Sequence, residues 1–259
     1  MSSKDINNHE GSQGIFNTNP EEISQESYEQ ATEVKLKPKG VKVIYGEKAV
    51  FKALSKAVQN AKDFVCSTRL SNHPLDLKKN HLEEFANSLR HVHTRSDPIS
   101  DSLKRIIVVN SNEKRQGVDD LLNIKGKLYL YLMTPTDNYN FEIVIIDNIK
   151  AFVLYRDKNT EPSDLCSYAF CCENDAFVQK EILLFSQLTK QAEEQEKIGA
   201  AMIIEKNEDT VIIKSKGSKT EGSKLKAMEE VKKFFEDTLM KQNLNENNYS
   251  SGLKMGNQS

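Results

Sequence analysis

The sequence predicts an α/β fold, a three-layer α/β/α sandwich whose mixed sheet has about seven strands. Two observations lead to this prediction. In the first half of the central region, short β-rich segments alternate with amphipathic helical segments. In the second half, four strand-like segments follow one another with short connections before a long helix closes the unit.

The alternating part begins at residue 41. Val41 to Tyr45 has β-type residues, and Gly46 breaks the segment before a new pattern starts. From Glu47 to Lys62, apolar residues recur at helical spacing with lysine and glutamine between them. The elements predicted next are a strand at 63–68, a helix at 82–92, a strand at 105–109 and a short helix that ends near residue 122.

The strand-rich part follows and ends in a helix from about Asn174 to Lys197. Its predicted strands are 127–132, 141–146, 151–155 and 165–172. Beyond the helix, two β-type segments flank a polar loop, which predicts a small hairpin before a linker at Ser215 to Ser223 and a terminal helix.

Composition divides the chain into four parts. Residues 1–39 are rich in Asn, Ser, Glu and Gln, so they could not offset their ordering entropy by burial, and we predict a disordered N-terminal arm. The domain is predicted at 40–197, and the hairpin, linker and helix at 198–242. The polar stretch 243–259 is predicted to be a disordered tail.

Composition and motifs also exclude several classes of protein. The formal net charge of −2 argues against a wholly basic nucleic-acid-binding surface. The sequence has no apolar run of spanning length and no signal-peptide core, so we expect a cytoplasmic protein without membrane insertion. The four cysteines form no CxxC pair and no glycine-rich phosphate loop is present, so no metal and no cofactor is predicted.

One segment carries a recognisable spacing of polar residues. Asn140, Glu142 and Asp147 flank the apolar run Ile143 to Ile146. This spacing resembles the His-x-Lys-x4-Asp motif of the phospholipase D superfamily, and the element order over residues 41 to 190 is similar to one phospholipase D-like unit. The chain also resembles the non-catalytic effector domains of archaeal TrmB-type regulators, without their winged helix.

The resemblance implies that the chemistry of the family has been lost. In active members, the histidine attacks phosphorus and the lysine holds the anionic oxygens. Asn140 carries an amide that is not nucleophilic, and Glu142 places a negative charge where a phosphate oxygen would lie. The Gly-Ser element of the family is also missing, because Leu154-Tyr155-Arg156 occupies that region. We therefore predict no catalytic residues.

The resulting hypothesis is a non-catalytic binding or regulatory module that senses a small-molecule ligand. Its predicted pocket contains Asn140, Glu142 and Asp147, with Arg156 at the rim. From charge alone, the two acids would favour a polyhydroxy or cationic compound over a phosphate. Superfamily members build their site from two units, so the resemblance also implies a homodimer or a protein partner.

Two alternatives stay open. The first is a phosphodiesterase or nuclease that uses Asp147, Glu142 and a histidine brought close by folding. The second is an accessory protein that binds nucleic acid through the basic segments Lys35 to Lys39 and Lys214 to Lys219. Neither segment has the interleaved aromatic residues that would support base stacking.

Overall fold

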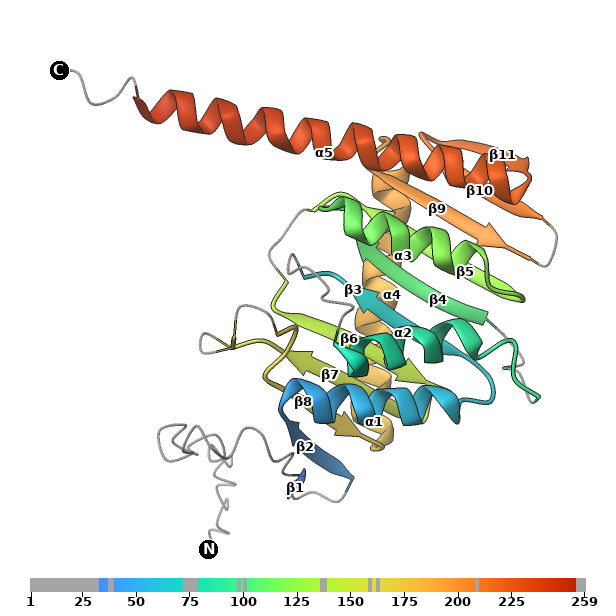
Figure 1. The fold of residues 1–259 in the computed structure, drawn as a ribbon, viewed down its shortest axis with the longest axis vertical. Helices are drawn as coiled ribbons and strands as arrows, with labels where there is room; N and C mark the ends of the chain where they lie inside the picture. Colours follow the sequence, from blue (N-terminus) through green and yellow to red (C-terminus); the bar gives the residue numbers. More distant parts are fainter. Residues whose placement is uncertain are drawn as a thin grey trace, which may run out of the picture.

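A mixed sheet of eleven strands organises the fold, with strand order β1-β2-β8-β7-β6-β3-β4-β5-β9-β10-β11 (Figure 1). The computed structural model describes residues 33–36, 40–71, 79–96, 99, 102–135, 139–157, 160–161, 164–207 and 210–254. The strands are β1 (Glu33–Leu36), β2 (Val41–Tyr45), β3 (Val65–Arg69), β4 (Ser102–Val108), β5 (Lys127–Met133), β6 (Phe141–Ile146), β7 (Lys150–Tyr155), β8 (Tyr168–Cys172), β9 (Ala201–Lys206), β10 (Val211–Ser215) and β11 (Ser218–Gly222).

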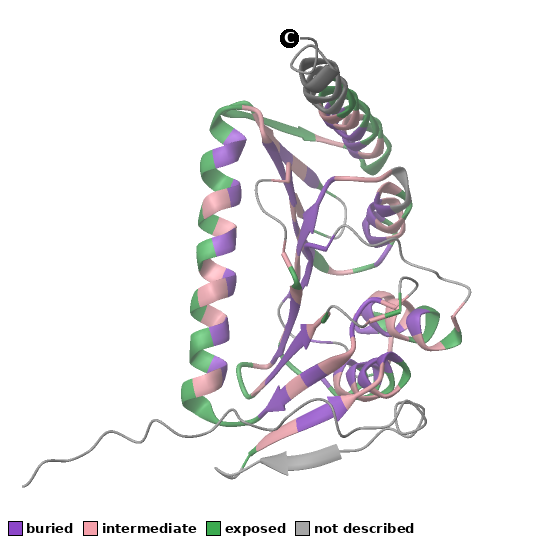
Figure 2. Ribbon diagram, turned by 90° about the vertical axis from the view of Figure 1, so that its left-hand side faces the viewer, coloured by how far each residue is buried: buried purple, intermediate pink, exposed green. Residues whose placement is uncertain are grey.

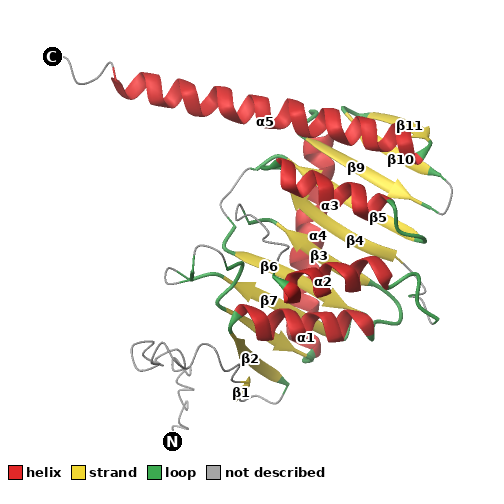
Figure 3. Ribbon diagram, viewed as in Figure 1, coloured by secondary structure: helices red, strands yellow, loops and turns green. Residues whose placement is uncertain are grey.

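Helices cover both faces of this sheet, so the predicted three-layer arrangement is confirmed (Figures 2 and 3). Four helices pack on one face, and the long helix α4 crosses the other face on its own. The helices are α1 (Glu47–Gln59), α2 (Asn80–His91), α3 (Asn112–Leu122), α4 (Asp175–Lys197) and α5 (Lys224–Lys254).

The centre of the sheet is parallel and its flanks are antiparallel. β3, β4 and β5 pair in parallel, as expected for strands joined by crossover helices. β6 runs antiparallel to β3 and β7, and residues 142–146 are buried because helices lie on both sides. The mixed sheet predicted from the sequence is therefore correct.

The sheet has more strands than the predicted seven because the C-terminal hairpin continues it. β9 pairs with β5 over Leu128 to Met133. The predicted small hairpin is therefore part of the main sheet and does not form a separate ribbon. The linker predicted at 215–223 is also wrong. Lys216 and Gly217 have φ values of 54° and 68°, the left-handed conformation of a two-residue hairpin turn, and β11 follows directly.

The two ends of the described region also differ from the predicted boundaries. Glu33 to Leu36, within the predicted arm, form β1 at the edge of the sheet. Residues 1–32 lie outside the described residues. α5 continues to Lys254, past the predicted boundary at 242, and its first half packs against α3 and β10. Among the described residues, no helix is both long enough and apolar enough to cross a membrane.

Candidate functional site

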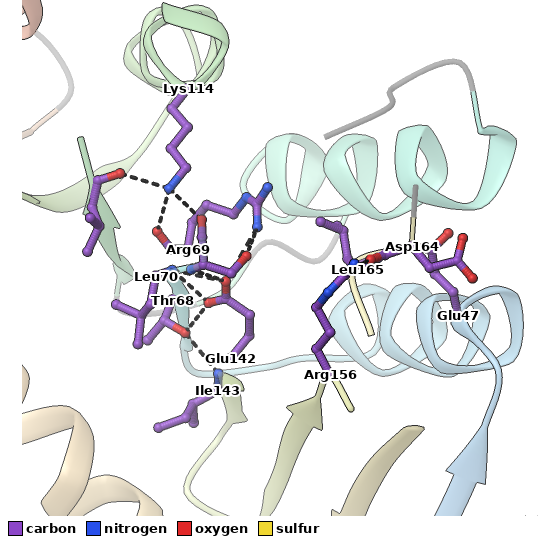
Figure 4. Close-up of polar contacts among 12 residues, drawn as sticks. Glu47, Thr68, Arg69, Leu70, Lys114, Glu142, Ile143, Arg156, Asp164 and Leu165 are labelled. Atoms are coloured by element: carbon purple, nitrogen blue, oxygen red, sulfur yellow. Dashed lines mark hydrogen bonds and ion pairs between the residues drawn. The ribbon is translucent and has the colours of Figure 1, made fainter. Parts of the chain in front are cut away.

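Glu142, one of the three residues that the sequence singled out, lies in a buried polar cluster at the start of β6 (Figure 4). The carboxylate accepts hydrogen bonds from the backbone amides of Leu70, at 3.0 Å and 2.9 Å, and of Ser71, at 2.9 Å. It also accepts a bond of 2.8 Å from the Thr68 hydroxyl. Nη1 of Arg69 lies 3.4 Å from the same carboxylate. Both carboxylate oxygens of Glu142 are thus held by groups of this chain.

The local structure explains why these groups converge. β3 ends at Arg69, so the amides of the next two residues have no strand partner and are free to turn toward β6. The hydroxyl of Thr68 donates a hydrogen bond to Glu142 and accepts a hydrogen bond of 2.8 Å from the amide of Ile143. Glu142 therefore ties the end of β3 to the beginning of β6, two segments more than seventy residues apart in the sequence.

The charge state of Glu142 follows from these contacts. Burial alone would raise the pKa of its carboxyl. The positive charge of Arg69 and the hydrogen bonds from Ser71, Leu70 and Thr68 outweigh burial, and the pKa is lowered. Glu142 is an anion whose charge is balanced inside the protein, so it does not present the free negative charge that the sequence predicted.

Positive charge exceeds negative charge around this carboxylate. Arg105 from β4 and Lys114 from α3 both interact electrostatically with Arg69 and Glu142. The amine of Lys114 donates to the carbonyls of Val108, at 2.8 Å, and Ser71, at 2.9 Å. Burial, and then the charge of Arg69, lower the pKa of Lys114 to about 7. The same two causes lower the pKa of Arg105 to about 10.

Two polar groups in this cluster have no hydrogen-bond partner within the described part of the chain. They are Nε of Arg105 and the hydroxyl of Ser67, both fully buried atoms. Ser67 and Arg105 are register partners on the parallel strands β3 and β4, so their side chains leave the same face of the sheet side by side. Buried polar groups in native proteins are nearly always satisfied by protein, water or ligand. The pair is therefore a candidate position for a polar atom of a water molecule or a ligand.

Asn140 and Arg156 lie close to the Glu142 end of β6 but outside this cluster. Asn140 is exposed, and its carbonyl accepts a hydrogen bond of 3.2 Å from the amide of Arg156. The guanidinium of Arg156 donates to the backbone carbonyls of Asp164 and Glu161. In Figure 4 it extends away from Glu142, toward the loop that contains Asp164. Arg156 therefore organises a loop.

Asp147 lies at the opposite end of β6 from Glu142. Its carboxylate accepts hydrogen bonds from the backbone amides of Lys62 at 2.8 Å, Asp63 at 2.8 Å and Phe64 at 3.0 Å. The residue has φ 53°, a turn conformation that aspartate tolerates. Asp147 thus caps the segment before β3, and the structure does not bring it together with Asn140 and Glu142.

The histidines in the described residues also lie away from Glu142. Nε2 of His81 is 2.7 Å from Glu47, which also binds the amine of Lys79 at 2.9 Å. These contacts join the first turns of α1 and α2. His93 packs against Gly126, and burial lowers the pKa of its imidazole. Within the described ranges, no group of three or more metal-binding side chains comes together.

Sequence reasoning missed the cations that define the cluster. Arg69, Arg105 and Lys114 were not singled out, because charged residues at a strand end, within a strand and on a short helix are ordinarily solvated. One signal was available. Arg105 lies directly before the apolar run Ile106 to Val108 of β4, a strand that is covered on both faces, where an arginine needs a buried partner.

Comparisons with known proteins place the fold in a wider setting. No protein-family model and no curated protein matches the sequence. Among solved structures, NucT from Helicobacter pylori has a TM-score of 0.42 and 14% identity, with 58% of this chain and 95% of that chain covered. Nuc from Salmonella typhimurium, a phospholipase D family member, has a TM-score of 0.39 and 12% identity over 57% and 91% of the chains.

An archaeal protein is similar at the same level. TrmBL2, an archaeal chromatin protein, has a TM-score of 0.39 and 11% identity, with 61% of this chain covered. This chain spans 55% of the length of TrmBL2. The solved structures that are similar thus include both phospholipase D family members and a DNA-binding protein. The function of the chain has to be inferred from its own residues.

Proposed function

We propose that this chain is a non-catalytic, phospholipase D-like binding module that holds an anionic ligand at the cluster of Arg69, Arg105 and Lys114. The observation that carries the proposal is the excess of positive charge around Glu142, together with the unpartnered Nε of Arg105. An uncompensated buried cation is unfavourable, and a bound anion would offset that penalty.

The proposed ligand class differs from the one expected from the sequence. Two free acids would have favoured a polyhydroxy or cationic compound. In the structure Glu142 is neutralised by Arg69 and four hydrogen bonds, and Asp147 lies at the other end of β6. The remaining charge of the cluster, on Arg105 and Lys114, is positive, and arginine binds planar and tetrahedral oxyanions well.

Loss of catalysis is the second part of the proposal. Phosphoryl transfer through a covalent intermediate needs a nucleophile with an adjacent base. The exposed amide of Asn140 supplies neither, and His81 pairs with Glu47 beside α1. The expected result is no cleavage of bis(p-nitrophenyl) phosphate by the full chain, with or without divalent metal. Turnover that is abolished by Glu142→Gln would contradict the proposal.

Titration calorimetry with the full chain tests the binding part. We expect heat of binding with inorganic phosphate or sulfate and none with glucose. Arg105→Gln should weaken anion binding by about tenfold or more, since a charge-assisted hydrogen bond contributes roughly 1.5–3 kcal/mol. Arg115→Gln is the matched control, because Arg115 lies on the same helix as Lys114 and pairs only weakly with Asp119, at 4.0 Å. Equal binding by both variants, or binding of glucose alone, would overturn the proposal.

We also propose that the chain self-associates. The resemblance to a superfamily with two-unit sites motivates a homodimer, and light scattering of the full chain over a range of concentrations tests it. A monomer at every concentration would remove the idea without affecting the calorimetry.

A further inference from the structure

β11 is the last strand at one edge of the eleven-stranded sheet (Figure 1). It pairs with β10 on one side, and its residues Ser218 to Glu221 are exposed. No strand of the described residues pairs with its outer side. The backbone amides and carbonyls at such an edge can pair with a further strand, unless the side chains of the edge oppose it. The side chains of β11 therefore decide what this edge can bind.

The backbone of the hairpin determines which groups of β11 point outward. The two-residue turn between β10 and β11 makes Ser215 and Ser218 a hydrogen-bonded pair. Hydrogen-bonded and non-hydrogen-bonded pairs alternate along antiparallel strands, so Thr220 bonds to β10 in the same way as Ser218. The amides and carbonyls of Lys219 and Glu221 therefore point to the free edge.

The two residues whose backbone faces outward, Lys219 and Glu221, have charges of opposite sign. Lys219 lies opposite Lys214 of β10, whose amine already pairs with Glu205. Glu221 lies opposite the apolar Ile212. Within the described part of the chain, neither Lys219 nor Glu221 forms an ion pair. Like charges opposite one another on neighbouring strands are unfavourable, so Lys219 would gain from an acidic neighbour on its other side.

A second, antiparallel copy of β11 supplies this neighbour in one register. With Thr220 on a two-fold axis, Lys219 lies opposite the partner's Glu221, and Glu221 lies opposite the partner's Lys219. Both are hydrogen-bonded pairs, so the outward amides and carbonyls are satisfied and an ion pair forms on each side of the axis. The registers shifted by two residues place Lys219 or Glu221 opposite its own copy, where like charges repel. Charge and hydrogen bonding thus select the same register.

We propose that β11 is the contact through which two copies of this chain associate, with Thr220 on the two-fold axis and Lys219 paired to the partner's Glu221. This inference rests on the self-association proposed above and names its interface. Because both copies use the same edge, the assembly closes as a dimer. A contact of five residues from each copy is small, so association should be weak and depend on concentration.

Pairing at this edge keeps the two proposed anion sites apart. Arg105 lies on β4, which is separated from β11 by β10, β9 and β5. Neighbouring strands are about 4.8 Å apart, so the two copies of Arg105 would be roughly 40 Å apart across the dimer. Each copy should therefore bind its anion independently of the other.

Cysteine cross-linking of the full chain tests the interface. Residues opposite one another in a non-hydrogen-bonded pair have Cα atoms about 4.5 Å apart, within the range that a disulfide spans. Thr220→Cys should therefore form a disulfide-linked dimer under mild oxidation. The native cysteines, Cys66, Cys166, Cys171 and Cys172, are buried and should not compete.

Ser218→Cys is the matched control, because Ser218 is exposed and lies on the same face of the same strand as Thr220. In the proposed register Ser218 lies opposite the partner's Gly222. The two cysteines of this variant would then be about 14 Å apart, too far for a disulfide. If Ser218→Cys links as fast as Thr220→Cys, the link reports random collision or another register, and the proposal is overturned.

Charge reversal in the Thr220→Cys chain tests the ion pairs. Lys219→Glu should lower the yield of linked dimer by about tenfold, because both cross-strand pairs become repulsive. Adding Glu221→Lys to that variant should restore the yield with the charges exchanged. Lys224→Glu, at an exposed lysine just beyond the strand, is the control and should leave the yield unchanged. Equal yields for Lys219→Glu and Lys224→Glu would contradict the proposed register.

Light scattering of the native chain separates failure of this inference from failure of self-association. A dimer whose Thr220→Cys variant forms no link would overturn the β11 interface and leave self-association standing. A monomer at every concentration, with no link in Thr220→Cys, would remove both. Circular dichroism of every variant separates loss of association from loss of folding.

Discussion

The two ends of β6 have acidic residues in very different surroundings. Glu142 at one end is buried, and its carboxylate is the counter-charge for Arg69 in a cluster that also contains Arg105 and Lys114. Asp147 at the other end is half-buried. Its carboxylate accepts hydrogen bonds from three backbone amides, and these donors carry no charge. The two acids of the sequence motif therefore have different structural roles, and the proposed anion site lies at the Glu142 end alone.

Replacement of Glu142 by glutamine should have the largest effect. The amide would leave Arg69 without its counter-charge and would turn a donor toward the amides of Leu70 and Ser71. Breaking one side of a buried ion pair lowers the free energy of unfolding by about 3–5 kcal/mol. Urea unfolding near neutral pH measures this change.

The control for this variant is Glu173→Gln. Glu173 is exposed and pairs with Lys150 at 2.6 Å on the surface, so its loss should change the free energy of unfolding by about 0–1 kcal/mol. If Glu142→Gln is as mild as this control, the cluster around Glu142 is not the charged core described above.

Replacement of Asp147 by alanine should have a smaller effect. The amides of Lys62, Asp63 and Phe64 would lose their acceptor but could be reached by water, and alanine is disfavoured at a φ of 53°. We expect a loss of about 2 kcal/mol in urea unfolding.

Two further variants sharpen the comparison between the ends of β6. Asp147→Asn tolerates the same backbone conformation and should lose less than Asp147→Ala. Asp237→Ala, an exposed site on α5, should change the free energy of unfolding by less than about 0.5 kcal/mol. An effect of Asp147→Ala as large as that of Glu142→Gln would remove the distinction between the two ends.

The pH dependence of stability isolates Lys114. Its pKa is about 7 in the folded chain and 10.5 ordinarily, so between these values the unfolded chain binds more protons than the folded chain. The free energy of unfolding should therefore rise with pH from about 7, by at most about 1.4 kcal/mol per pH unit. Lys114→Met should remove this rise.

That measurement should be made below about pH 9, because other groups titrate in the unfolded chain at higher pH. Burial raises the pKa of the Cys171 thiol to about 11 and of the Tyr131 hydroxyl to about 12. These groups lose their protons first in the unfolded chain, which lowers stability as the pH rises further. The difference between native chain and Lys114→Met, measured from pH 7 to 8.5, is free of both. Equal slopes for the two proteins would contradict an amine with a lowered pKa.

The sequence was sufficient for elements with strong periodicity and insufficient for contacts between distant segments. β6 was predicted at its observed bounds because Ile143 to Ile146 form an uninterrupted apolar run, and the turn at Asp147 followed from residue type. The extra strand β11 was missed because its residues are polar and lie at an exposed edge. Its turn is formed by Lys216, a residue type that rarely adopts positive φ.

The site itself shows where prediction stops. The spacing of Asn140, Glu142 and Asp147 identified the correct strand, but the environment of Glu142 depends on Leu70 and Ser71, which local pattern cannot place beside it. The rise of about 3.3 Å per residue alone puts Asp147 and Glu142 at opposite ends of the strand, about 16 Å apart. This distance is too long for both side chains to line one small pocket. Residue type alone does not indicate this, because it contains no information on strand length.

The titration of Lys114 tests most directly the proposal that the cluster around Glu142 is a cationic site that binds an anion. NMR of the lysine side chains can follow its amine in the full chain from pH 6 to 9, without and with sulfate, whose charge is constant over this range. We predict a pKa of about 7 in the free chain, a clear increase when sulfate is present, and no increase in Arg105→Gln. A pKa that is the same with and without sulfate would contradict the account.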